Sequence, residues 1–169
     1  MKNLFYLFLA LLAVSCSGSK SGTTTATKMN KKTLKGTWEI TDIRFVGEEG
    51  LYKADLFGLA DSPCFKASEW VFIPNNGTGK FTIQPATRCD AGTHRILWSF
   101  NETADGSTQF QFKYVDERNK PLSGDKSGYR ANIDTLTPGN MVLRVKSNYQ
   151  GTPFDIVLTM EKTSEDYTL

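Results

Sequence analysis

The chain has 169 residues, of which 39% are apolar and 22% are charged, and its formal net charge is +2. This length predicts a single domain. The nearly balanced charge argues against nucleic acid as a partner, because phosphate binding requires a concentrated basic face. Aromatic residues at 12% exclude a wholly disordered chain. With three Cys and one His, the chain is not expected to hold a Cys/His zinc cluster, another metal or a cofactor.

Residues 1–15 have the features of an export signal. Lys2 supplies a positive start, and an apolar run of eleven residues from Leu4 to Val14 follows it. A helix needs about 20 apolar residues to cross the hydrocarbon core of a bilayer. The run therefore predicts a signal peptide and not a membrane span.

The residues at the end of this signal point to lipidation. Ala13-Val14-Ser15-Cys16 resembles the lipobox of bacterial lipoproteins, in which the Cys is acylated and becomes the N-terminus. The resemblance implies a stable membrane anchor on Cys16. Several acyl chains bind a protein firmly to a bilayer, whereas a single chain binds it only marginally. The alternative is an ordinary secretory signal, with Cys16 as a bystander.

Residues 16–35 predict a flexible tether between this anchor and a folded domain over residues 36–169. Ser, Gly, Thr and Lys dominate the tether, and such a composition stays solvated. No acidic run follows Cys16, whereas in Bacteroides-type lipoproteins such a run accompanies display on the outer face. We therefore expect an outer-membrane lipid anchor in the cell envelope that faces the periplasm.

Cys64 and Cys89 remain once Cys16 is acylated. An even pair of cysteines in an oxidising compartment predicts a disulfide. Closing the loop between them is worth roughly 3.5 kcal/mol in the chain-entropy model. Two free buried thiols are the alternative. A catalytic thiolate assisted by His94 is disfavoured, because residues five apart along a strand point to opposite faces.

From residue 37 onward, apolar and polar residues alternate with a period of two, which predicts strands with one buried face. Turn sequences such as Asn75–Gly79, Ala104–Gly106 and Thr137–Asn140 separate these strands. The eight expected strands cover residues 37–46, 69–73, 80–84, 93–101, 107–116, 127–135, 141–147 and 153–162.

The short connections favour an all-β, eight-stranded antiparallel up-and-down barrel over a two-sheet sandwich, which more often needs crossovers. The one long connection is the first loop, Gly47–Ala67, which contains Leu56 and Phe57. We expect it to form a short helix or a lid over one end of the barrel.

Leu34-Lys35-Gly36-Thr37-Trp38-Glu39-Ile40 resembles the Gly-x-Trp signature of lipocalins. Over about residues 34–162 the layout is similar to that of Bacteroidetes-type lipocalin-like lipoproteins. The shared features are Cys64 before an aromatic strand, the turn at 76–79, Cys89 before Trp98, and the Leu-Thr-Pro-Gly-Asn-Met-Val-Leu run from Leu136. The resemblance implies a lipocalin-like barrel that Trp38 closes at one end. The Arg that covers this Trp in lipocalins has no secure match in the sequence.

The inward faces of the predicted barrel carry large aromatic side chains. They are Trp70, Phe72, Phe81, Trp98, Phe100, Phe110, Phe112 and Tyr114. Such rings suit a small hydrophobic or aromatic ligand. An eight-stranded barrel is just wide enough to hold one ligand or to be filled by its own side chains, so a packed core is the alternative.

The sequence contains no nucleophile elbow and no phosphate-binding loop, and we interpret His94 as a surface or loop residue. We expect a protein that is not an enzyme and that binds a small hydrophobic ligand while membrane lipid holds it through Cys16. The alternative is an envelope accessory protein with a filled barrel, whose loops contact a protein partner.

Overall fold

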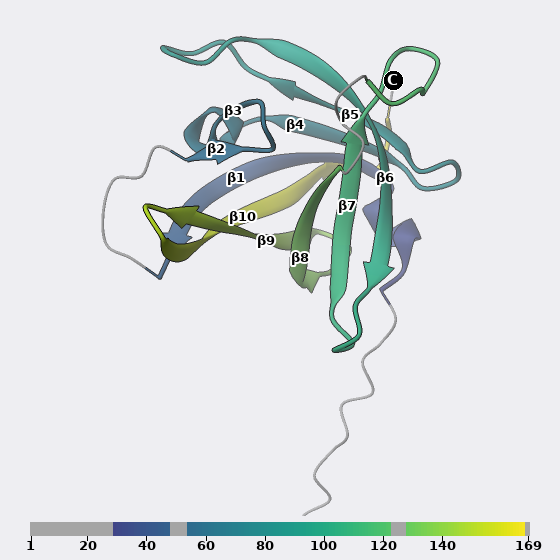
Figure 1. The fold of residues 1–169 in the computed structure, drawn as a ribbon. Helices are drawn as coiled ribbons and strands as arrows, with labels where there is room; N and C mark the ends of the chain where they lie inside the picture. Colours follow the sequence, from purple (N-terminus) through teal and green to yellow (C-terminus); the bar gives the residue numbers. More distant parts are fainter. Residues whose placement is uncertain (1–28, 48–53, 123–127, 168–169) are drawn as a thin grey trace, which may run out of the picture.

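The structure is a computed structural model that describes residues 29–47, 54–122 and 128–167. The signal peptide, Cys16 and residues 17–28 of the predicted tether lie outside these ranges. Eight antiparallel strands close into a barrel in the order β1–β10–β9–β8–β7–β6–β5–β4 (Figure 1). The strands are β1 (Gly36–Val46), β4 (Glu69–Ile73), β5 (Thr78–Ile83), β6 (Gly92–Glu102), β7 (Thr108–Tyr114), β8 (Tyr129–Leu136), β9 (Asn140–Tyr149) and β10 (Thr152–Ser164).

This architecture confirms the predicted up-and-down barrel, and each strand boundary lies within two residues of its predicted position. From β4 to β10, each strand pairs with the next one in the chain. The first strand closes the ring, because Gly36–Glu39 of β1 pairs with Glu69–Phe72 of β4. Closure removes the free sheet edges, which would otherwise expose unpaired backbone groups.

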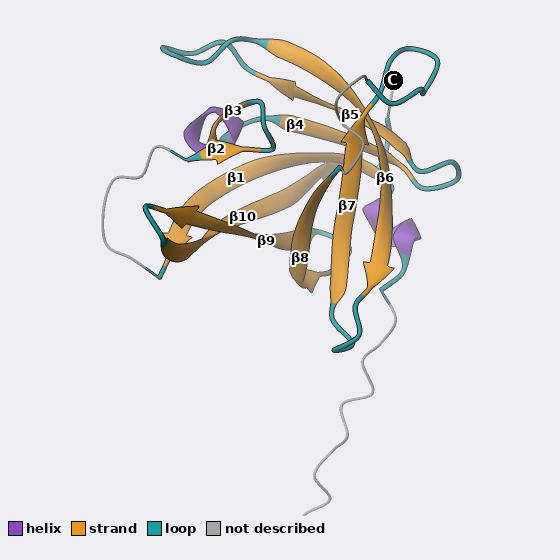
Figure 2. Ribbon diagram, in the orientation of Figure 1, coloured by secondary structure: helices purple, strands orange, loops and turns teal. Residues whose placement is uncertain are grey.

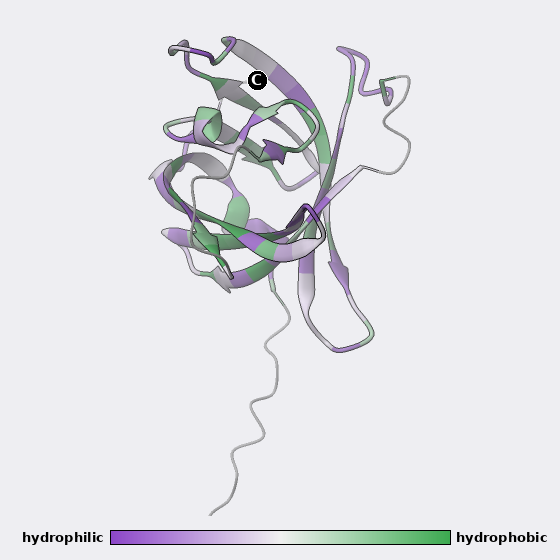
Figure 3. Cartoon of the chain, turned by 60° about the vertical axis from the view of Figure 1, so that its left-hand side comes forward, coloured by the Kyte–Doolittle hydropathy of each residue, from purple (hydrophilic) through white to green (hydrophobic). Residues whose placement is uncertain are grey.

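The apolar and polar residues that alternate in the sequence point alternately into the barrel and toward its outer surface. On β7, the side chains of Phe110, Phe112 and Tyr114 are buried, while Gln111 and Lys113 between them are half-buried. Figure 3 shows the same exchange of hydrophobic and hydrophilic residues along the strands. Burying one large apolar side chain contributes roughly 1.5–3 kcal/mol, so these inward faces supply most of the driving force for closure.

The described part of the long connection, residues 54–67, crosses one end of the barrel. It contains β2 (Asp55–Leu56), β3 (Ala60–Asp61) and the 3-10 helix η2 (Ser62–Phe65). The backbone N–H of Ala67 donates to Ile40 of β1 at 2.8 Å, and Tyr114 of β7 donates to the carbonyl of Phe57 at 3.0 Å. Strands β1 and β7 stand opposite each other in the barrel order. We call residues 54–67 the mouth segment, and the end that they cover the mouth.

A second 3-10 helix, η1 (Lys31–Leu34), precedes the barrel (Figure 2). It lies within the range that the sequence assigns to the tether, and the chain is therefore folded before residue 36. The physical reason is Leu34, whose side chain is fully buried and whose carbonyl accepts the indole N–H of Trp38 at 3.0 Å. Within residues 29–47, 54–122 and 128–167, no helix is long and apolar enough to span a membrane.

Candidate functional site

The predicted lining residues come together on four consecutive strands, β4 to β7. The rings of Trp70 and Phe81 stack with their centroids 4.3 Å apart, and the ring of Phe72 meets that of Trp98 edge-on at 5.5 Å. Seven of the eight predicted residues are buried, among them Phe110, Phe112 and Tyr114. Strands β8 to β10 on the opposite side contribute mostly aliphatic side chains, such as Ile133, Met141, Leu143, Ile156 and Leu158, beside the aromatic Phe154. The interior therefore has one aromatic wall and one mainly aliphatic wall.

Phe100 is the member of the predicted set that is only partly buried. Strand β5 begins at Thr78, which pairs with Leu97, so the last residues of β6 extend beyond β5. Phe100 lies on this extension and, together with Met29, lines a surface cavity of about 350 Å³. Phe100 packs against the edge of the core and is not one of the enclosed aromatic rings.

Phe57 of the mouth segment completes the aromatic wall from outside the barrel strands. Its ring meets the ring of Phe112 at 4.9 Å, that of Phe65 at 5.6 Å and that of Tyr129 at 5.9 Å, each in an edge-on arrangement. Only 5% of Phe57 is exposed. A ring carried by a loop therefore fills the mouth end of the aromatic cluster.

The mouth segment holds this ring in an unfavourable backbone conformation. Phe57 has a φ of 57° and Ala67 a φ of 60°, in the left-handed region that costs residues other than Gly roughly 1–2 kcal/mol. The side-chain oxygen of Ser62 is buried without a hydrogen-bond partner, and such a group is also costly. Three local penalties thus lie within one segment of 14 residues.

Two kinds of bond oppose these penalties. The Tyr114 hydroxyl donates to the Phe57 carbonyl at 3.0 Å, and the backbone N–H of Gly58 donates to Asp55 Oδ1 at 2.8 Å. A disulfide between Cys64 and Cys89 fastens η2 to the connection between β5 and β6. The predicted disulfide is confirmed, and its position links it to the mouth of the barrel.

His94 also lies at the mouth, directly opposite Phe81 in the pairing of β5 with β6. Its ring stacks on that of Phe81 at 5.1 Å and lies 5.8 Å from that of Tyr114. Burial lowers the pKa of His94 below its ordinary value of 6.5. His94 is half-buried on strand β6, so it is not a loop residue, and its ring is only partly at the surface. The alternation His94, Ile96, Trp98 contained the signal for its inward position.

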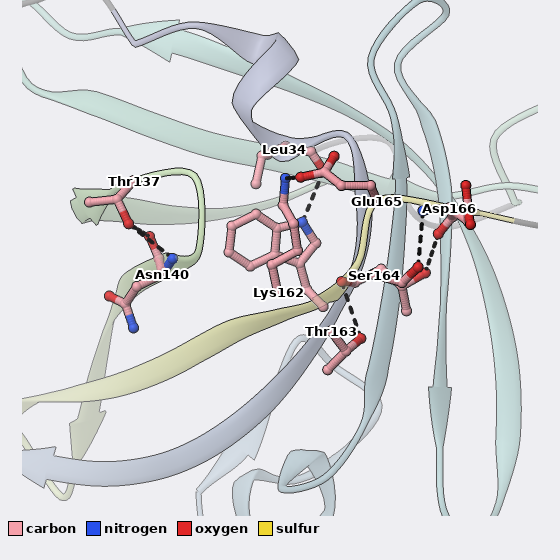
Figure 4. Close-up of polar contacts among 10 residues, drawn as sticks. Leu34, Thr137, Asn140, Lys162, Thr163, Ser164, Glu165 and Asp166 are labelled. Atoms are coloured by element: carbon pink, nitrogen blue, oxygen red, sulfur yellow. Dashed lines mark hydrogen bonds and ion pairs between the residues drawn. The ribbon is translucent and has the colours of Figure 1, made fainter.

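The opposite end of the barrel is closed around Trp38, which is fully buried. Lys162 near the end of β10 places its ammonium 5.2 Å from the centre of the Trp38 ring and 3.0 Å from Glu165 Oε1. Figure 4 shows Lys162 and Glu165 side by side, with Leu34 next to them. The sequence did not identify Lys162, because no motif residue marks the end of the last strand.

The outer wall carries its own depressions. A groove of about 410 Å³ lies over β6 and β7, lined by side chains such as Leu97, Ser99, Gln111 and Lys113, which alternate with the inward rings. A smaller depression over β7 to β9 contains Arg144, whose pKa is raised by its bonds to Asp134 and then to Asp155. In the described part of the chain, no three His, Cys, Asp or Glu residues lie close enough to hold a metal ion.

No protein-family model and no curated protein matches the chain. Similar solved structures include two of bovine odorant-binding protein. Its complex with a selenium-containing odorant is 15% identical, with a TM-score of 0.41, over 82% of this chain and 75% of that one. The protein from bovine nasal mucosa is 14% identical, with a TM-score of 0.42, over 83% of this chain and 78% of that one. At this level of similarity the comparisons carry no argument about function, which has to come from the site itself.

Proposed function

We propose that this protein is a lipid-anchored envelope protein of the lipocalin-like lipoprotein type, whose barrel binds a small hydrophobic or aromatic molecule at its mouth. The observation that carries the proposal is the position of Phe57. Its ring occupies a place in the aromatic cluster that no barrel strand fills, and the segment that carries it is strained. Strained residues cluster at ligand sites and switch regions, where the strain favours a conformational change of the backbone when a ligand binds.

The proposed binding exchanges one ring for another. In the unliganded protein, Phe57 keeps water away from Phe112 and Trp70, whose ring centroids lie 4.9 and 6.3 Å from its own. An entering hydrophobic molecule takes this place, and the mouth segment moves aside. The strain at Phe57 and Ala67 is then released, which favours the exchange. The covalent bond at Cys64 limits how far the segment moves.

The experiment measures binding of the fluorescent probe N-phenyl-1-naphthylamine to the exported protein carrying Cys16→Ser, so that neither acyl chains nor detergent compete for the mouth. We expect saturable binding of one probe per chain. Phe57→Ala removes the competing ring and should bind the probe more tightly. Phe45→Ala is the matched control, because this ring on β1 packs on Phe154 of β10 at 6.0 Å, across the barrel order from the β7 ring of Phe112 that Phe57 contacts, and the affinity should be unchanged.

Two outcomes would contradict ligand binding. Absence of saturable binding in every variant would mean that the aromatic cluster is simply the filling of the barrel. Binding by Phe57→Ala alone would report a cavity made by the substitution. Either result would favour the second candidate, an accessory protein that uses its outer surface. The observation in favour of that candidate is the open groove over β6 and β7, of about 410 Å³.

The proposed anchor depends on Cys16, and it is tested separately. In the full chain, Cys16→Ser should abolish flotation with membranes. The matched control is the double variant Cys64→Ser and Cys89→Ser, which removes two cysteines and keeps the lipidation site. Continued flotation of the Cys16→Ser protein would overturn the lipoprotein proposal without affecting the proposed ligand site.

A further inference from the structure

We propose that the outer wall of the barrel over β5 to β8 binds an extended acidic segment of a partner protein, in which Asp or Glu stands at every second position. This proposal goes beyond the ligand site at the mouth, because it concerns side chains that point away from the barrel interior. It assigns an occupant to the groove over β6 and β7.

Four basic side chains form a band across this wall. Lys80 of β5 lies directly opposite Arg95 of β6. Lys113 of β7 lies opposite Leu97 and therefore diagonally from Arg95. Arg130 of β8 lies opposite Gln111 and therefore diagonally from Lys113. The four strands are consecutive neighbours in the barrel (Figure 1), so the Cβ atoms of successive members of this basic band are about 5–8 Å apart.

The charge of the basic band is uncompensated. Among the residues that the structure describes, none of its four side chains forms an ion pair or a hydrogen bond, whereas Arg144 and Lys162 each bond to an acid. The domain as a whole is acidic, because residues 36–169 contain 14 Lys and Arg against 18 Asp and Glu. Like charges that face each other across two strands, as Lys80 and Arg95 do, destabilise a sheet. An anionic partner would remove this repulsion.

The acids nearest to the basic band do not neutralise it. Glu69 lies opposite Thr82 and therefore only diagonally from Lys80, with which it forms no ion pair. Asp116, in the loop that follows β7, accepts the backbone N–H groups of Arg118 and Lys120 with its carboxylate. Leu97 and Gln111, the outward residues between members of the basic band, carry no charge. The wall therefore presents one sign of charge to a partner.

The groove over β6 and β7 favours an elongated partner over a flat one. It has a volume of about 410 Å³, and Lys113 lies in its lining with Leu97, Ser99 and Gln111. Lys113 is half-buried, so a flat anionic surface would meet the rim of the groove before it met this side chain. A narrow chain can enter the groove. Ser99 and Gln111 then offer hydrogen bonds to its backbone, and Leu97 packs against the methylene groups of its acidic side chains.

The spacing of the basic band matches that of an extended peptide. Alternate side chains of a strand lie on the same face, about 6.8 Å apart along the chain. This distance falls within the range that separates successive cations on the wall. Carboxylates at every second position therefore meet successive members of the basic band, while the residues between them face solvent.

The test measures binding of two fluorescein-labelled peptides to the exported Cys16→Ser protein by fluorescence anisotropy. The first is Glu-Thr-Glu-Thr-Glu-Thr-Glu, and the second has the same composition in the order Glu-Glu-Glu-Glu-Thr-Thr-Thr. We expect the alternating peptide to bind more tightly. Lys113→Gln and Arg95→Gln should each lower its association constant roughly 5-fold, the upper value for one exposed ion pair. Arg44→Gln is the matched control, because it removes the same charge from the exposed side of β1, opposite β7, and it should leave the affinity unchanged.

Three binding results would overturn the proposal. Equal affinities for the two peptides would exclude the matched spacing. An equal loss of affinity in Arg44→Gln would mean that the peptide responds to overall charge and not to this wall. Binding of dextran sulfate with no binding of either peptide would assign the basic band to an anionic polysaccharide. Each of these results leaves the ligand site at the mouth standing, because that site is tested by the naphthylamine probe.

A stability measurement tests the uncompensated charge without any ligand. Lys80→Gln removes the repulsion from Arg95, so it should raise the urea midpoint of unfolding while it lowers the affinity for the alternating peptide. Residues that serve only the fold lower stability when they are replaced. A urea midpoint below that of the unsubstituted protein would therefore overturn the proposal.

Discussion

Lys162 covers the ring of Trp38 with its ammonium group, at 5.2 Å from the ring centre, while the indole N–H of Trp38 donates to Leu34 at 3.0 Å. The last residue of η1 and a residue near the end of β10 thus both contact the side chain of Trp38. Because Trp38 is fully buried, this contact joins β1 and β10 at the point where Trp38 and Lys162 pair. The sequence offered no secure match for the Arg that covers the Trp of the lipocalin signature, and in this structure the cation over the Trp38 ring is Lys162.

Lys162→Met should lower the free energy of unfolding by about 1 kcal/mol, because it keeps the length of the side chain and removes the cation from the ring. Urea denaturation monitored by fluorescence measures the change. Glu165→Gln is the control. The Glu165 side chain is 69% exposed, and exposed ion pairs contribute about 0–1 kcal/mol. If Glu165→Gln destabilised the protein as much as Lys162→Met, the ion pair and not the ring contact would be the important interaction.

The disulfide should be worth roughly 3.5 kcal/mol, since it closes a loop with a sequence separation of 25 residues. The double variant Cys64→Ala and Cys89→Ala should lose about this amount of unfolding free energy in urea. Reduction of the unsubstituted protein should have the same effect, whereas reduction of the double variant should have none. A double variant as stable as the oxidised protein would mean that the mouth segment is held by its packing alone.

The strand pattern could be predicted from the sequence because the alternation on β7 and the turns between strands act locally. The same locality explains the error at Phe100. Whether an inward residue is enclosed depends on the length of the neighbouring strand, and β5 begins too late to cover this one. Where one strand ends relative to its neighbour is set by the pairing between the two strands. A local stretch of sequence contains no information about that pairing.

The site was predictable on its barrel side and much less so on its mouth side. Trp70 and Phe112 follow from strand alternation. The loop containing Phe57 was expected only as a lid, because no periodicity indicates which ring of a loop turns inward. The donor role of Tyr114 also could not be read from the sequence, since its acceptor is a backbone carbonyl 57 residues away.

His94 should make stability depend on pH. Burial lowers its pKa in the folded state below 6.5, so the unfolded chain binds more protons between these two values. Stability is therefore fully present above pH 6.5 and falls as the pH drops through that value toward the folded pKa. His94→Gln should remove this dependence between about pH 7 and 5.5, where carboxyl groups of ordinary pKa remain charged. Equal slopes for both proteins, measured by urea denaturation at each pH, would contradict the burial of the imidazole.

The strain at Phe57 predicts a reversal of the usual order of Ala and Gly substitutions. Phe57→Ala and Phe57→Gly lose the same ring, but Gly adopts the φ of 57° freely, which returns roughly 1–2 kcal/mol. The greater freedom of Gly in the unfolded chain subtracts about 0.5–1 kcal/mol. Phe57→Gly should therefore be the more stable variant of the two, by about 0.5–1 kcal/mol in urea denaturation.

Phe65 provides the control, because it lies in the same segment within the 3-10 helix η2 and is fully buried. Its backbone has no strain to release, so Phe65→Gly should be less stable than Phe65→Ala by about 0.5–1 kcal/mol. The sign of the Ala-to-Gly difference is thus opposite at the two positions. If Gly were the weaker substitution at Phe57 as well, the closed mouth segment would store no strain, and its displacement by a ligand would lose this driving force.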